Sequence, residues 1–247
     1  MKPQDLFKFK PSRELFAVLA NYVLITGVFY LSFQVITIKN VAAQFITFGV
    51  IGILLLGIFA PAIYNTLIMK RPLSAIGIKN DKLLLSIGLC IIFSVVQYFL
   101  TLSKLDLPDF KSLLPLAFMA VTVGLFESIF FRGFAQLRIE ESFGIIPGII
   151  LSALIYCSYH VGYGMRGSEY ITLFIIGIIY STIFRLTNNI FILFPLLTPM
   201  GALFTNIKEG LSIPFEAIIG FSMVIGIAVI GLVVINRAYK KSQLKTQ

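Results

Sequence analysis

Long apolar runs separated by short polar breaks dominate the chain of 247 residues. A membrane-spanning helix needs about 20 mostly apolar residues. Eight windows meet or approach that length, so the pattern predicts an all-α polytopic bundle of about eight transmembrane helices. The windows run from Phe16 to Ile36, Ala42 to Met69, Leu83 to Leu102, Leu113 to Phe131, Ile145 to Val161, Tyr170 to Leu186, Ile190 to Phe204, and Ile213 to Ile235. The fifth and seventh are short.

The breaks between the windows contain polar or turn-forming residues. No internal repeat, low-complexity segment or linker separates one group of windows from another, and we therefore expect residues 1–247 to form a single membrane-embedded domain. The basic N-terminal segment, Met1 to Arg13, precedes an apolar run that is too long for the core of a signal peptide. A retained first helix is the expected outcome.

The composition agrees with a membrane protein. Hydrophobic residues make up 58% of the chain and charged residues 13%, against about 25% charged residues in an average soluble domain. These values exclude an ordinary soluble globule, a disordered chain and a disulfide scaffold. The two cysteines, Cys90 and Cys157, lie inside apolar runs, where we expect them to behave as small buried hydrophobic side chains.

The net charge of +9 does not indicate nucleic-acid binding, because the basic residues flank the apolar windows and form no compact stripe. With the N-terminus inside, 15 basic residues fall in inner segments and 5 in outer ones. This bias predicts an even number of spans with both termini cytoplasmic. The inner residues are Lys2, Lys8, Lys10, Arg13, Lys70, Arg71, Lys79, Lys82, Arg132, Arg138, Arg185, Arg237, Lys240, Lys241 and Lys245, and the outer ones are Lys39, Lys104, Lys111, Arg166 and Lys208.

Two ionisable residues stand out because such groups are costly inside a membrane and are functional candidates there. Glu127 follows the apolar run that begins at Leu113, and His160, the single histidine, ends another. A turn near Gly144 would fold their helices into a hairpin. At 1.5 Å per residue both side chains would lie roughly 22–26 Å from that turn, at similar depth. We therefore expect the two groups to face each other.

Water activation is the chemistry that suits this pair. A carboxylate in a low-dielectric pocket binds a proton more tightly than in water, which suits a general base, and an imidazole can orient the same water or protonate a leaving amine. Amide hydrolysis is the natural reaction, although it also needs an oxyanion stabiliser. Three alternatives remain open: structural pairing of Glu127 with Arg132, a proton or ion path, and a metal site, for which Glu127 and His160 supply two ligands.

The sequence FESIFFRG at Phe126 to Gly133, followed by YCSYH ending at His160, resembles the CPBP family. This is the CAAX prenyl protease and bacteriocin-processing family of intramembrane proteases, also called Abi. Its first motif is Glu-Glu-x-x-x-Arg and its second is aromatic-x-x-x-His. Glu127 matches the first glutamate, Arg132 the arginine, and Tyr156 with His160 the second motif. The resemblance covers roughly residues 113–203, the expected family core.

The resemblance implies a helical-bundle endopeptidase that hydrolyses a peptide bond of a membrane-associated substrate. Glu127 would be the general base, His160 its partner and Arg132 an orienting residue. In type II CAAX prenyl endopeptidases the substrate is a prenylated C-terminal tripeptide. Other bacterial relatives are tied to peptide maturation, bacteriocin immunity or regulation, so a non-catalytic membrane adaptor or immunity protein is the alternative.

The chain departs from the family pattern at two places. Ser128 stands where the family has its second glutamate, and the later histidine is missing. By spacing, that histidine would fall near Leu197 or Thr198. Ser128, Asn188, Asn189 or Thr198 could supply a supporting or oxyanion hydrogen bond instead. We expect no cofactor, with zinc as the alternative. The expected location is the plasma membrane, with the bilayer and a peptide or protein substrate as partners.

Overall fold

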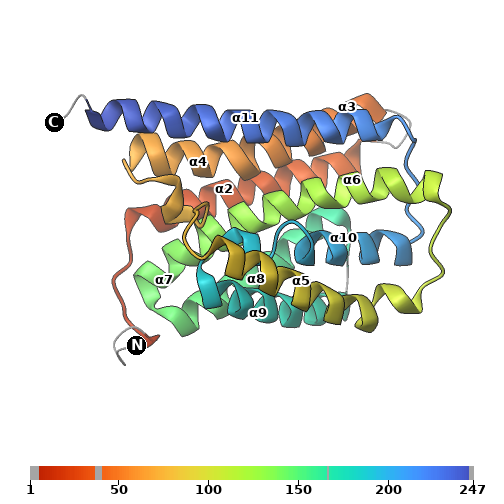
Figure 1. The fold of residues 1–247 in the computed structure, drawn as a ribbon, viewed down its shortest axis with the longest axis horizontal. Helices are drawn as coiled ribbons and strands as arrows, with labels where there is room; N and C mark the ends of the chain where they lie inside the picture. Colours follow the sequence, from red (N-terminus) through yellow and green to blue (C-terminus); the bar gives the residue numbers. More distant parts are fainter. Residues whose placement is uncertain (1–5, 37–40, 166, 245–247) are drawn as a thin grey trace.

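The computed structural model describes residues 6–36, 41–165 and 167–244, and these residues form a bundle of helices without strands (Figure 1). Seven helices of this region are long and apolar enough to cross a membrane. The basic residues Lys2, Lys39, Arg166 and Lys245 of the charge-bias argument lie outside the described residues. The seven helices are Arg13–Val35 (α2 with η1), Val41–Ile68 (α3, η2, α4 and η3), Leu83–Lys104 (α5 with η5), Phe110–Phe143 (α6, η6 and α7), Ile145–Tyr163 (α8 with η7), Glu169–Thr187 (α9) and Ala217–Leu244 (α11).

The all-α polytopic bundle is confirmed, but the window Ile190 to Phe204 does not form a spanning helix. Asn188 adopts a left-handed conformation with φ 50° at the end of α9. The chain then forms only a short 3₁₀ turn, η8 (Ile190–Ile192), and the twelve-residue α10 (Leu197–Lys208). Pro195 cannot donate a backbone hydrogen bond, which favours a break there. Twelve residues extend about 18 Å, less than the roughly 30 Å of a hydrocarbon core.

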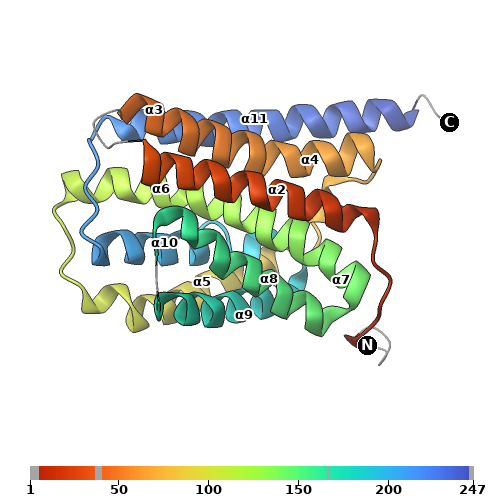
Figure 2. The ribbon, with the colours of Figure 1, turned by 180° about the vertical axis from the view of Figure 1, so that it is seen from behind.

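The irregular segment that follows α9 and the helix α10 together still carry the chain back across the bundle. As a result, the segment preceding α2 and the C-terminal end of α11 lie at the same end of the molecule in both views (Figures 1 and 2). A helix broken in this way is compatible with a bilayer only if protein surrounds its irregular part.

The side chain of Asn189 forms hydrogen bonds with backbone groups around that irregular part. Its amide nitrogen donates to the carbonyl oxygens of Lys79 and Asp81, each at 2.9 Å, and its side-chain oxygen accepts from the backbone of Phe191. The backbone N–H of Ile190 donates to Gly77. Asn189, Ile190 and Ile192 are buried, whereas Pro195 and Leu196 are exposed, so protein surrounds the first part of the break.

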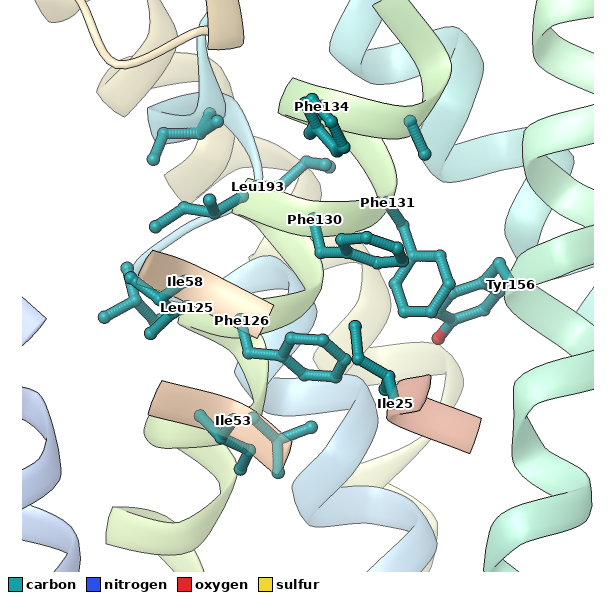
Figure 3. Close-up of a cluster of buried hydrophobic side chains, with 14 of the residues drawn as sticks. Ile25, Ile53, Ile58, Leu125, Phe126, Phe130, Phe131, Phe134, Tyr156 and Leu193 are labelled. Atoms are coloured by element: carbon teal, nitrogen blue, oxygen red, sulfur yellow. The ribbon is translucent and has the colours of Figure 1, made fainter. Parts of the chain in front are cut away.

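The helix Phe110–Phe143 is the centre of the bundle and the most buried of the seven, whereas α5 and α11 expose most of their apolar side chains. Phe126, Phe130 and Phe131 of this helix lie in the aromatic core, and Phe131 packs edge-on against Tyr156 of α8 (Figure 3). Phe126 packs edge-on against Phe29 of α2. The exposed apolar faces of the outer helices suit the bilayer as solvent.

Asp109 begins the central helix, and its carboxylate accepts hydrogen bonds from the backbone of Lys111 and Ser112. The hydrogen bond from the Ser112 backbone lowers the pKa of Asp109. An ionised carboxylate is favourable at the positive end of a helix dipole. This cap therefore fixes where the central helix starts.

Four charged side chains tie helices together at the end of the bundle where the chain starts. Glu14 accepts hydrogen bonds from Arg71 and Arg138, and Glu141 forms ion pairs with both arginines at 3.1 and 3.0 Å. Arg138 is 2% exposed and also donates to the Ala75 carbonyl. The two positive charges of this cluster are matched by two negative ones, and the pairing permits burial of Arg138 and Glu14, whereas Glu141 is exposed.

Two glycines fix the position of the central helix. Gly144, with φ 92°, makes the turn between α7 and α8 and so forms the predicted hairpin. Gly133 lies where a Cβ atom would overlap the carbonyl oxygen of Ile76. Because that neighbour is backbone, it cannot rotate away, and close approach of the two segments requires glycine.

Replacing Gly133 by alanine should therefore destabilise the protein by about 1–3 kcal/mol, the usual cost of overpacking. Thermal unfolding in detergent measures the effect as a lower Tm. Gly88→Ala is the matched control, because a Cβ at Gly88 meets nothing within 4 Å. Equal Tm values for the two variants would contradict the close approach.

Candidate functional site

Glu127 and His160 are both buried inside the bundle. Glu127 is the last residue of α6 and is 5% exposed, and His160 follows α8 as the first residue of η7 and is 6% exposed. Both lie within helices of membrane-spanning length. Ionisable side chains at such depth are rare without a specific partner.

Tyr159 connects the two groups. Its hydroxyl donates a hydrogen bond to Oε1 of Glu127, and its ring centroid lies 4.1 Å from that of His160. The hairpin thus brings the end of α8 beside the end of α6, but Glu127 binds Tyr159 and His160 binds the Tyr156 carbonyl, and no direct contact joins the two predicted groups within the described residues. Tyr159 itself is a site residue that the sequence argument missed.

The hydrogen bond of the His160 ring indicates which nitrogen carries the proton. Nδ1 lies 2.9 Å from the carbonyl oxygen of Tyr156, and a carbonyl can only accept. Nδ1 is therefore the donor, and a neutral ring presents Nε2 as an acceptor. This orientation would let Nε2 receive a proton from water or from a polar substrate group.

Arg132 lies one helical turn beyond Glu127, on η6 (Ser128–Gln136), and is 2% exposed. Its Nη1 donates to the Ser181 hydroxyl of α9 at 2.6 Å, and its guanidinium carbon lies 4.7 Å above the Tyr156 ring. It also interacts electrostatically with Glu127. Nη2 is buried and has no hydrogen-bond partner within the described residues, so Arg132 retains donor capacity.

Ser128 and Thr198, two of the predicted supporting residues, lie together. Their hydroxyl oxygens are 3.5 Å apart, and both side chains are buried. The contact joins the central helix to the first turn of α10. Close packing of Gly124 against Pro199 supports the same junction, since a Cβ at Gly124 would contact the proline ring at 2.5 Å.

Asn188 and Asn189 occupy other places. The side-chain oxygen of Asn188 accepts from Arg185 at 2.8 Å, and Asn189 binds the carbonyl groups described above. Both side chains therefore have structural partners around the break after α9. Of the four predicted supporting residues, the structure brings only Ser128 and Thr198 to the segment that carries Glu127.

Further polar side chains support the site. Ser181 also contacts Ser152 of α8 at 3.0 Å between hydroxyl oxygens. The Tyr180 hydroxyl donates to Gln97 at 2.9 Å and lies 3.2 Å from the Leu197 carbonyl oxygen, where α10 begins. These contacts connect α5, α8, α9 and α10 around the central helix.

A signal for part of this set was present in the sequence. Ser152, Tyr156, Tyr159 and Tyr163 recur at intervals of three or four residues, which places them on one face of a helix. A polar stripe of this kind on an otherwise apolar membrane helix indicates an inward-facing surface. The partners on α9, Tyr180 and Ser181, had no comparable signal.

Within the described ranges, no group of three or more His, Cys, Asp or Glu side chains could hold a metal ion. Glu127 and His160 provide two donors, one fewer than the three protein ligands usual for catalytic zinc. Cys90 and Cys157 are buried and free.

Comparison with known families identifies the segment around the site. Residues 109–196 match the family model described as Rce1-like, the type II CAAX prenyl endopeptidase Rce1-like family. The matched segment contains Glu127, Arg132 and His160, and the predicted resemblance to the CPBP family is confirmed over this segment. No curated protein and no solved structure matches the chain.

Replacing Tyr159 by phenylalanine should lower the free energy of unfolding by about 1–3 kcal/mol, because the buried Glu127 carboxyl group loses its hydrogen-bond donor. Unfolding in detergent, followed by circular dichroism, measures the change. Tyr98→Phe, which removes a hydroxyl from a half-exposed side chain of α5, should leave stability unchanged. If the Tyr159→Phe variant has the same free energy of unfolding as wild type, the hydrogen bond does not stabilise the protein.

Proposed function

We propose that this chain, whose segment 109–196 matches the Rce1-like type II CAAX prenyl endopeptidases, is an intramembrane endopeptidase. It would hydrolyse a peptide bond of a membrane-associated peptide or protein. The observation that carries the proposal is the buried Glu127 carboxyl group joined through Tyr159 to His160, within the segment that matches the family.

In the proposed mechanism Glu127 is the general base. It takes a proton from a water molecule, which then attacks the scissile carbonyl carbon. His160 orients that water through Nε2, because Nδ1 is engaged with the Tyr156 carbonyl. Arg132 orients the carboxylate electrostatically while Ser181 and the Tyr156 ring hold its guanidinium in place.

The burial of both groups constrains how a substrate reaches them. Glu127 is 5% exposed and His160 is 6% exposed, so helices around the site must separate to admit water and a peptide. The substrate of the matched family ends in a prenylated cysteine and three further residues. A farnesylated peptide of that form, in proteoliposomes, is therefore the first substrate to assay.

Glu127→Gln should abolish cleavage of this peptide, with kcat falling at least about 10²-fold because the amide cannot accept the proton from water. Fluorescence dequenching of a labelled peptide measures turnover. Glu216→Gln makes the same chemical change at an exposed carboxylate before α11 and should keep wild-type kcat. Equal turnover in wild type and Glu127→Gln would contradict the proposed role of Glu127 as the general base.

The alternative function is a non-catalytic membrane adaptor or a bacteriocin-immunity or regulatory protein with a degenerate site. Two observations favour it: Ser128 replaces the second family glutamate and contacts Thr198, and His160 is the only histidine of the chain. If folded Glu127→Gln and His160→Ala variants both retain the cellular phenotype of wild type, the adaptor function is the correct one.

The proposed reaction uses water activated by Glu127 and requires no metal. Cleavage should therefore keep the same rate after treatment with EDTA or 1,10-phenanthroline and dialysis. Loss of turnover, restored by added Zn²⁺, would support the zinc alternative, in which Glu127 and His160 are two of the ligands.

We also propose the plasma membrane as the location, with both termini cytoplasmic. The segment preceding α2 and the C-terminal end of α11 lie at one end of the described bundle (Figure 1), and the basic residues are concentrated in the segments assigned to the inside. A membrane-impermeant maleimide added to intact cells should label Lys208→Cys but not Lys241→Cys. The reverse labelling would contradict the orientation.

A further inference from the structure

Tyr163 has a buried hydroxyl group that no other described residue satisfies. Its oxygen is inaccessible and has no protein hydrogen-bond partner. Nearly all buried polar atoms in proteins are hydrogen-bonded, so each exception needs an explanation. The cost of burying an unpaired donor is accepted where that donor is used by a ligand or by catalysis.

The position of Tyr163 places this donor at the site. It is the last residue of η7 (His160–Tyr163), and its ring centroid lies 5.7 Å from those of both Tyr159 and His160. The phenol interacts electrostatically with Glu127, and its hydrogen-bond interaction with the Tyr159 side chain falls short of hydrogen-bond geometry. The unpaired hydroxyl is thus next to the groups proposed to activate water.

Apolar rings hold the Tyr163 side chain in place. Its ring packs against Phe33 at 4.9 Å, Phe29 at 5.3 Å and Phe48 at 6.2 Å between centroids. These rings come from the first two membrane-spanning helices, and they offer the hydroxyl no strong acceptor. A donor held rigidly in such surroundings is preorganised, because it does not have to break another bond before it binds a ligand.

A surface pocket of about 340 Å³ lies beside the same turn. Val161 and Gly164, on either side of Tyr163, line it together with Met165 and residues of the first helix. Gly164 has φ +85°, and a Cβ there would contact the Gln34 side chain at 2.6 Å. The pocket lies on the surface side of the turn, and neither Tyr163 nor His160 lines it.

We propose that the Tyr163 hydroxyl is a catalytic hydrogen-bond donor, which stabilises the oxyanion formed when water attacks the scissile carbonyl. The inference rests on the proposed endopeptidase function and extends it, since amide hydrolysis requires such a donor. It also gives the unpaired hydroxyl a partner that exists only during the reaction.

The step is balanced without any further reactant. Water forms a bond to the carbonyl carbon and gives one proton to Glu127, while the carbonyl π electrons move to oxygen. That oxyanion accepts a hydrogen bond from Tyr163. The intermediate collapses with cleavage of the C–N bond, and the departing nitrogen takes the proton from Glu127. The products are a carboxylic acid and an amine.

Tyr163→Phe tests the assignment in proteoliposomes with the farnesylated peptide. We expect kcat to fall about 10²–10³-fold, the usual effect of losing one oxyanion donor, with KM within about threefold of wild type because the interaction is made only in the transition state. The Tm should stay equal to that of wild type or rise, because no resting-state hydrogen bond is lost.

Two matched variants sharpen the test. Tyr98→Phe should keep both kcat and Tm, whereas Tyr159→Phe should lower Tm through its lost bond to Glu127. A phosphinic analogue of the peptide, which mimics the tetrahedral oxyanion, should bind Tyr163→Phe about 10²–10³-fold more weakly than wild type. Its farnesylated but uncleaved counterpart should bind both proteins equally.

The outcomes separate this inference from the proposed function. If Glu127→Gln is inactive but Tyr163→Phe keeps kcat within about threefold of wild type, the assignment of Tyr163 is wrong and the endopeptidase function stands. A fall in kcat together with a lower Tm also overturns it, because the hydroxyl then acts through folding. If wild type does not cleave the peptide, or Glu127→Gln cleaves it as well as wild type, both proposals fail.

Discussion

The hydrogen bond from Tyr159 to Glu127 connects the two halves of the candidate site. A carboxyl group at membrane depth needs a polar partner, since lipid offers none. That partner comes from the neighbouring helix of the hairpin, and the same tyrosine ring packs against His160. Burial of Glu127, alignment of α8 with α6 and placement of the imidazole therefore depend on one contact between two adjacent helices.

At the break after α9, side-chain hydrogen bonds replace the backbone hydrogen bonds of a regular helix. Asn189 binds two carbonyl groups of the segment before α5, so the chain can leave the helical conformation without exposing unpaired groups to lipid. The break shortens α10 and places Thr198 beside Ser128. A continuous helix through the same residues would keep its backbone hydrogen bonds internal and would need no such partner.

Each motif residue makes a different contact in this structure. Glu127 is bound by Tyr159, Arg132 by Ser181, and Gly133 allows the central helix to approach the backbone at Ile76. None of these contacts lies within one helix. The residues of this one segment thus make their contacts with several different helices.

The sequence by itself determined the membrane bundle, seven of its helices, the hairpin at Gly144 and the buried positions of Glu127 and His160, because hydrophobic length and glycine conformation act locally along the chain. It predicted a full helix over Ile190 to Phe204, because that window is apolar. Only the tertiary structure decided the break there and the contacts made by Tyr159, Tyr163 and Ser181. The spacing of Tyr159 and Tyr163 indicates one face of a helix, but their partners depend on hydrogen bonds and ring packing between helices distant in sequence.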